Sequence, residues 1–107
     1  MKALLTLLVT LLVTAQTPTL TQRPRIIYGA GTKSCVSWTA SRKTPNWYVD
    51  GSWVLGFVSA ASLYFTDPLR DTSSQDIAAW IDDYCLSHPD DDISDAAGLL
   101  LQALGAR

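Results

Sequence analysis

Cys85 and His88 are the residues of this chain whose types and spacing come closest to a reactive site. They lie three positions apart in the segment WIDDYCLSHP, and His88 is the only histidine. This spacing is compatible with a metal site, with a thiolate activated by imidazole, or with no chemistry at all. Zinc needs three or four ligands from Cys, His or carboxylate side chains, and a nucleophilic cysteine needs a free thiolate. The choice therefore depends on whether Cys85 is free.

The N-terminal residues predict the redox state of Cys85. Residues 1–15 have the three parts of a secretory signal: basic Lys2, an apolar run over 3–13, and small residues before a cleavage point after Ala15. The run is shorter than the ~20 apolar residues of a membrane span, and a retained N-terminal anchor helix is the alternative. We expect export to the periplasm or the medium, with no membrane contact after cleavage. In an exported chain, two cysteines indicate one disulfide, Cys35–Cys85, which leaves no thiolate for a metal or for catalysis.

The acidic residues are all aspartates, and they could in principle pair as acid and base in a hydrolase. Asp82 and Asp83 are adjacent on a predicted helix, so their side chains diverge, while residues 90–92 (DDD) lie in a predicted solvated turn. We interpret the aspartates as helix caps and surface charge, and predict no catalytic residue, cofactor or metal. The net charge of −2 argues against nucleic acid as a partner, because phosphate binding requires a clustered basic surface.

Hydrophobic spacing predicts an all-α domain over residues 32–107. A flexible segment over 16–31 precedes it, and we expect the end of that segment, which holds its only apolar cluster (residues 26–28), to pack on the domain. The four expected helices run from Thr32 or Ser34 to about Lys43, from Asn46 or Asp50 through Phe65, from Ser73 or Ser74 to Pro89, and from residues 90–92 to Gly105. Their inward faces are 47, 54, 57, 58, 61 and 65 in the second helix, 77, 80, 81, 84, 85 and 88 in the third, and 93, 96, 97, 100 and 104 in the fourth.

Two features of the predicted second helix are unusual for a helix: a hairpin signal near its start and a glycine in its interior. Asp50-Gly51 is a hairpin signal between two short apolar runs, so a pair of strands is the competing prediction. Gly56 lies in the helix interior, where glycine costs about 1 kcal/mol relative to alanine. We expect close approach of another helix at Gly56.

Candidate binding residues are an aromatic pair and an acidic turn. Trp47 and Tyr48 lie beside Arg42 and Lys43 at a loop-to-helix junction, and exposed aromatic residues with arginine are typical of protein-binding hot spots. The partner-binding residues that we predict are Trp47, Tyr48, Asp90, Asp91 and Asp92.

Short motifs resemble two groups of small exported bacterial proteins. The YC–HP turn (residues 84–89), followed by Ala96-Ala97 and Ala103-Leu104, resembles the Rap/Tai group of type VI secretion immunity proteins. Two cysteines fifty positions apart with Gly56-Phe57 between them are similar to the HdeA group of acid-stress chaperones. Both resemblances imply a short all-α periplasmic domain stapled by a disulfide.

The expected function is therefore that of a non-enzymatic exported protein, a monomer or homodimer, which binds a protein partner and neutralises a secreted toxin. The alternative is an acid-stress chaperone, which would expose apolar surface as its carboxylates protonate below about pH 4. A small hydrolase is a third class, and it would require a rate that depends on His88.

Overall fold

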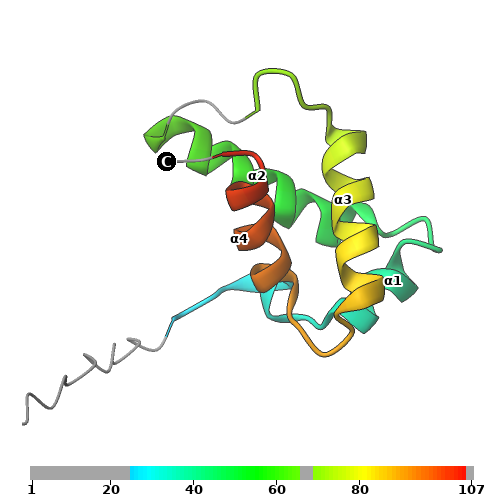
Figure 1. Cartoon of the computed structure of the whole chain (residues 1–107). Coiled ribbons are helices and arrows are strands. Elements are labelled where there is room, and N and C mark those ends of the chain that lie inside the picture. The colour runs from blue at the N-terminus through cyan, green and yellow to red at the C-terminus, as the bar shows by residue number, and fades with distance from the viewer. Residues whose placement is uncertain (1–24, 66–68, 106–107) are drawn as a thin grey trace, which may run out of the picture.

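Four α-helices and one short 3-10 helix form the domain in the computed structural model, which describes residues 25–65 and 69–105 (Figure 1). Within these ranges the only β pairing is an isolated bridge between Ser34 and Asp92. The predicted all-α four-helix fold is confirmed, and the competing strand pair does not form. The expected signal peptide lies outside the described residues. The elements are η1 (Gly29–Thr32), α1 (Cys35–Ser41), α2 (Tyr48–Tyr64), α3 (Ser74–Ser87) and α4 (Ile93–Ala103).

Side-chain caps start three of the four α-helices where the sequence predicts them. The Ser34 hydroxyl accepts the Ser37 N–H at 3.1 Å and begins α1. Ser73 begins α3 and Asp92 begins α4, each in a reciprocal capping box with the aspartate three residues later. The free N–H groups of these first turns are thus satisfied locally.

The core lies where α1, α2, α3 and α4 meet. Trp38 of α1 is its largest fully buried side chain, and α3 lies between α1 and α4 while α2 packs on α4 and η1. The disulfide Cys35–Cys85 joins the first turn of α1 to the last turns of α3, as predicted. The buried apolar cluster consists of Cys35, Trp38, Val54, Val58, Ile77, Ala78, Ile81, Cys85, Ile93, Ala96 and Leu100.

The ends of α1 and α4 are joined by the backbone. The Cys35 N–H donates to the Asp91 carbonyl at 2.7 Å, and the Ile93 N–H donates to the Lys33 carbonyl at 2.9 Å. These two bonds hold the start of α1 against the start of α4. The disulfide connects α1 to α3, and these two hydrogen bonds connect it to α4.

The segment before α1 packs on α2. The Trp53 indole Nε1 donates to the Tyr28 carbonyl at 2.8 Å. The ring of Trp53 lies so close to buried Gly31 that a Cβ there would be 2.2 Å from its Cζ2 atom. The packed unit therefore begins before the predicted boundary at Thr32, because Trp53 holds η1 in place.

The prediction for Gly56 is wrong, because a Cβ at that position would meet no atom within 4 Å. The close approach in α2 occurs instead at Gly51, where a Cβ would lie 2.5 Å from Cζ3 of Trp47. The contact is made by an aromatic ring one turn earlier in the chain rather than by another helix.

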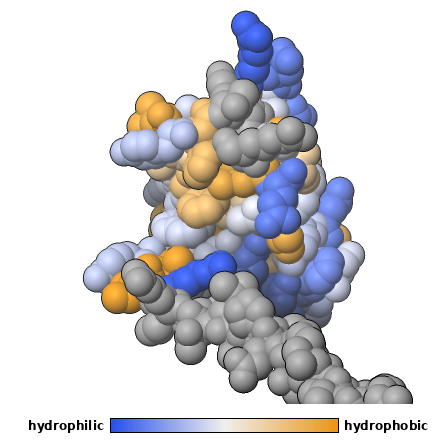
Figure 2. All heavy atoms as spheres, turned by 60° about the vertical axis from the view of Figure 1, so that its left-hand side comes forward, coloured by the Kyte–Doolittle hydropathy of each residue, from blue (hydrophilic) through white to orange (hydrophobic). Residues whose placement is uncertain are grey.

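The predicted inward face of α2 is only partly buried. Val54, Val58 and Ala61 are buried, but Phe65 at the end is half exposed, because α2 extends beyond the end of α4 (Figure 1). Figure 2 shows apolar side chains gathered on the side of the molecule where α2 and α4 end, where Leu63 and Phe65 are exposed.

Candidate functional site

The cysteine–histidine pair forms no reactive centre. Cys35 and Cys85 are both buried and bonded to each other, and the described residues include no free cysteine. His88 instead ends α3: its Nδ1 lies 3.0 Å from the Tyr84 carbonyl oxygen, and its ring stacks on that of Tyr84 with centroids 4.1 Å apart. A thiolate for nucleophilic attack is therefore not present at this site.

Asp82 is held by two residues of the α1 segment. One of its carboxylate oxygens accepts the Trp38 indole N–H at 2.8 Å and the Arg42 Nε–H at 2.9 Å, and the other accepts Arg42 Nη2 at 3.1 Å. The guanidinium of Arg42 also lies over the ring of Trp47, 4.3 Å from its centroid. This network connects α1, α3 and the start of α2 by charge-assisted hydrogen bonds and a cation–π contact.

The aspartates of the turn before α4 have structural partners. Asp91 accepts a short hydrogen bond from the Tyr84 hydroxyl, and Asp92 caps α4. The bond to the Asp91 carboxylate, with smaller contributions from burial and the charges of Asp91 and Asp95, raises the pKa of Tyr84 to about 12. Asp90 is exposed. Nowhere in the described ranges do three His, Cys or acidic side chains gather closely enough to hold a metal ion.

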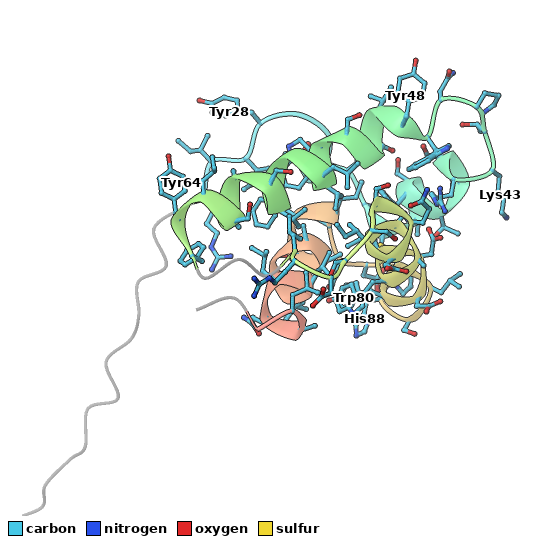
Figure 3. The ribbon with its side chains drawn as sticks, turned by 90° about the horizontal axis from the view of Figure 1, so that it is seen from above. Tyr28, Lys43, Tyr48, Tyr64, Trp80 and His88 are labelled. Atoms are coloured by element: carbon cyan, nitrogen blue, oxygen red, sulfur yellow. A yellow bond between two sulfur atoms is a disulfide. The ribbon has the colours of Figure 1, made fainter. Side chains whose placement is uncertain are left out.

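The predicted aromatic pair divides into one structural and one free residue. Trp47 is half-buried and contacts both Arg42 and Gly51, whereas Tyr48 is 58% exposed. In Figure 3, Tyr48 and Lys43 lie toward one end of α2, and Tyr28 and Tyr64 lie toward the other.

The two sets of predicted binding residues do not meet. Trp47 lines one small hollow together with Ser74 and Ile77 in the first turns of α3, whereas residues 90–92 follow the last turn of α3. A helix of 14 residues is about 20 Å long, so the aromatic pair and the acidic turn lie at opposite ends of α3. They cannot form one compact site.

Sequence reasoning missed a buried carboxylate. Asp50 is only 2% exposed, and its Oδ1 accepts a hydrogen bond from the Lys33 ammonium at 2.8 Å. The general interpretation of the aspartates as caps and surface charge is wrong for this residue. The signal was present, because Asp50 falls at helical spacing between Trp47 and Val54 on the inward face.

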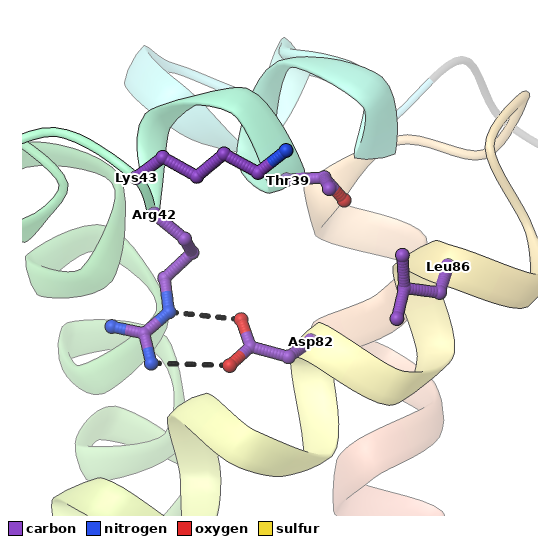
Figure 4. Close-up of a pocket in the computed structure, with 5 residues that line it drawn as sticks. All are labelled: Thr39, Arg42, Lys43, Asp82 and Leu86. Atoms are coloured by element: carbon purple, nitrogen blue, oxygen red, sulfur yellow. Dashed lines mark hydrogen bonds and ion pairs between the residues drawn. The ribbon is translucent and has the colours of Figure 1, made fainter.

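Sequence reasoning also missed a groove between α1 and α3. Two hollows of about 400 and 280 Å³ adjoin there and share Thr39, Lys43 and Leu86. Figure 4 shows Lys43 and Thr39 on the α1 side, Leu86 on the α3 side, and the Arg42–Asp82 ion pair between the two helices. We call this feature the α1–α3 groove and define it by Val36, Thr39, Ala40, Lys43, Leu86 and Pro89.

The exposed apolar residues of the groove directly follow the two cysteines. Val36 is 58% exposed and Leu86 is 67% exposed. Because each residue of an α-helix is rotated by about 100° from the one before, the disulfide faces inward while Val36 and Leu86 point outward. A large aliphatic residue after each cysteine was the sequence signal for this groove.

Comparisons with known proteins give no relative. No protein-family model matches the chain, and no curated protein or solved structure is detectably similar to it. Among the described helices, none combines the length and the apolar character needed to cross a bilayer.

Proposed function

We propose that this chain is a non-enzymatic exported protein that binds and neutralises a secreted toxin in the periplasm. One observation carries the proposal: large apolar side chains are exposed on a small, cross-linked helical scaffold, while the groups suited to chemistry are engaged in structural contacts. Such exposed apolar surface is typical of protein-interaction sites. The large apolar side chains exposed among the described residues are Ile26, Tyr28, Val36, Tyr48, Val49, Leu63, Tyr64, Phe65, Leu86 and Leu99.

The disulfide and the motifs support the compartment and the role. A buried disulfide in a small domain is typical of an oxidising compartment, which agrees with the expected signal peptide. The YC–HP turn that resembles the Rap/Tai group corresponds to the end of α3, where Cys85 bonds to Cys35 and His88 ends the helix. The proposed family likeness therefore rests on residues that build the scaffold.

A co-expression experiment tests the neutralising role. A secreted hydrolase encoded beside this chain is produced in the periplasm of a test bacterium, with and without the exported chain. We expect the chain to restore growth, to form a stoichiometric complex with the hydrolase and to inhibit it. The chain produced without its first 15 residues, and so retained in the cytoplasm, is the matched control and should not protect. No neighbouring hydrolase, together with no specific partner in a pull-down from native periplasm, would contradict the proposal.

An acid-stress chaperone is the second candidate, and the buried Asp50 favours it. The ion pair between the Asp50 carboxylate and the Lys33 ammonium ties the segment before α1 to the first turn of α2, so its loss would release that segment. Release of that segment would expose Trp53, whose ring covers Gly31. An acid-driven increase in apolar surface is the property that a chaperone of this kind needs.

Acid treatment distinguishes the chaperone from the toxin-neutralising protein. The chaperone role predicts that binding of a hydrophobic dye and suppression of client aggregation both appear below about pH 4. Asp50→Asn should bring on the dye binding at neutral pH, whereas Asp90→Asn, in an exposed turn, should not. A chain that stays folded in acid and leaves client aggregation unchanged would eliminate this candidate.

A further inference from the structure

The α1–α3 groove exposes aliphatic surface that the fold itself does not require. Val36 and Leu86 lie on either side of it and are both more than half exposed, while the cysteines beside them supply the buried contact between α1 and α3. Exposed aliphatic side chains that face each other across a hollow provide contact surface for a second molecule.

The groove also has a cation without a partner. Arg42 is neutralised by Asp82 at 2.9 Å, but Lys43 makes no ion pair with any residue that the structure describes. Helix α1 contains no acidic residue. The charge available to an incoming group at this end of the groove is therefore the positive charge of the Lys43 ammonium.

The walls of the groove are held rigidly before any ligand arrives. The disulfide fixes one end of the α1–α3 contact, and the bidentate Arg42–Asp82 pair with the Trp38–Asp82 bond fixes the other. A surface that is already ordered loses little conformational entropy on binding. Arg42 is held further by its stacking over Trp47.

The shape favours a chain segment over a small molecule. The two hollows are open to solvent and run along neighbouring helices, whereas small-molecule sites enclose most of their ligand. We propose that the α1–α3 groove binds a segment of a partner protein in which an aliphatic side chain lies close to a carboxylate. The aliphatic group packs on Val36 and Leu86, and the carboxylate pairs with Lys43. This inference rests on the proposed protein-binding function and names its surface.

A peptide selection tests the groove independently of the native partner. The oxidised chain from Gln16 to Arg107 is used to select from a phage-displayed library of random peptides. We expect the enriched peptides to share an aliphatic residue near an aspartate or glutamate. For a synthetic peptide of the consensus sequence, Leu86→Ser should weaken binding by about tenfold or more. Lys43→Glu should weaken it by about tenfold and abolish its salt dependence.

Two variants serve as matched controls. Lys43→Arg keeps the charge and should retain most of the affinity. Leu63→Ser removes another exposed leucine, 78% exposed, from the far end of α2 and should leave the affinity unchanged. All four substitutions are at exposed positions, so circular dichroism and thermal unfolding should match the wild-type chain.

The outcomes separate failure of the groove from failure of the proposed function. Peptide binding that survives Leu86→Ser and Lys43→Glu but is lost in Leu63→Ser would overturn the groove and leave a protein-binding role in place. Concentration-dependent self-association abolished by Leu86→Ser would identify a second copy as the occupant and would also overturn the proposal. If no peptide is enriched, the groove proposal fails, and if the native pull-down is also empty, the binding function fails with it.

Discussion

Asp82 organises the interface between α1 and α3 at the scale of single residues. It accepts the indole N–H of Trp38, a side chain only 1% exposed, and it also holds the guanidinium of Arg42. A buried donor that loses its acceptor costs more than an ordinary hydrogen bond contributes. Asp83, the next residue, is exposed, so the two aspartates have the same chemistry but different structural roles.

Asp82→Ala should lower the free energy of unfolding by about 2 kcal/mol, because the Trp38 N–H and the Arg42 guanidinium both lose their partner. Urea unfolding monitored by tryptophan fluorescence measures this loss. Asp83→Ala is the matched control and should be neutral or slightly stabilising, since alanine has the higher helix propensity. Equal effects of the two substitutions would mean that the Asp82 network does not stabilise the fold.

The raised pKa of Tyr84 should make the stability of the fold depend on pH in the alkaline range. Its hydrogen bond to the Asp91 carboxylate raises its pKa from 10 to about 12 in the folded protein. The folded-state pKa of Tyr84 lies above the unfolded-state value. The contribution of the Tyr84–Asp91 hydrogen bond to the free energy of unfolding is therefore fully present below pH 10 and is lost as pH rises through 12. Stability should fall across this window.

Tyr84→Phe should flatten the stability profile between pH 10 and 12, because the ionisable hydroxyl is gone. Urea midpoints recorded across this range, with tyrosinate absorbance as a second measurement, test the expectation. Tyr64→Phe removes the hydroxyl of an exposed tyrosine and should keep the wild-type profile. A profile that is unchanged in Tyr84→Phe would count against the role of the Asp91 bond.

At the scale of elements, two glycines of α2 have opposite surroundings. Gly51 lies against the ring of Trp47, which also contacts the Arg42 guanidinium. Gly56 faces open space. One glycine is needed for packing, and the other only lowers the helix propensity of the segment.

Gly56→Ala should stabilise the domain by about 1 kcal/mol through helix propensity alone. Gly51→Ala should destabilise it by about 1 kcal/mol or more, because the displacement of Trp47 outweighs the same gain in propensity. Thermal unfolding of the two variants side by side provides the test. If both substitutions raise the midpoint, the packing of Trp47 on Gly51 is not a constraint on the fold.

At the scale of the whole molecule, three contacts between residues far apart in sequence join the segment around the start of α1 to the other three α-helices. The disulfide spans 50 residues, the Ser34–Asp92 bridge joins the start of α1 to the start of α4, and Lys33 with Asp50 joins the N-terminal segment to α2. A domain this small buries a limited core, so these links represent a large part of its stability.

Reduction of the disulfide should lower the free energy of unfolding by about 4 kcal/mol on the chain-entropy model for a loop of this length. Urea unfolding curves of the oxidised chain, recorded with and without dithiothreitol, measure the difference. Coincident curves would mean that the remaining long-range contacts hold the domain without the disulfide.

Local chemistry made the helices and the disulfide predictable from the sequence. The capping side chains Ser34, Ser73 and Asp92 act on N–H groups within three residues of themselves, so the signal and its partner lie in the same short stretch. The same holds for Gly105, whose φ of 76° suits a residue just after a helix end. The pairing of Cys35 with Cys85 needed only the count of two cysteines in a chain that we predict to be exported.

The candidate site could not be predicted from local sequence patterns, because it depends on which helix faces pack against each other. The sequence predicts an exposed aromatic residue at Trp47, but Trp47 contacts Arg42 and Gly51 in the structure. It likewise predicts a surface charge at Asp50, but Asp50 is paired with Lys33. The groove forms because the disulfide and the Asp82 network hold α1 against α3 with Val36 and Leu86 on the same hollow. Helix formation is determined by neighbours within one turn, whereas burial and surface shape follow from the relative rotation of helices far apart in sequence, and that rotation is determined by packing of the whole core.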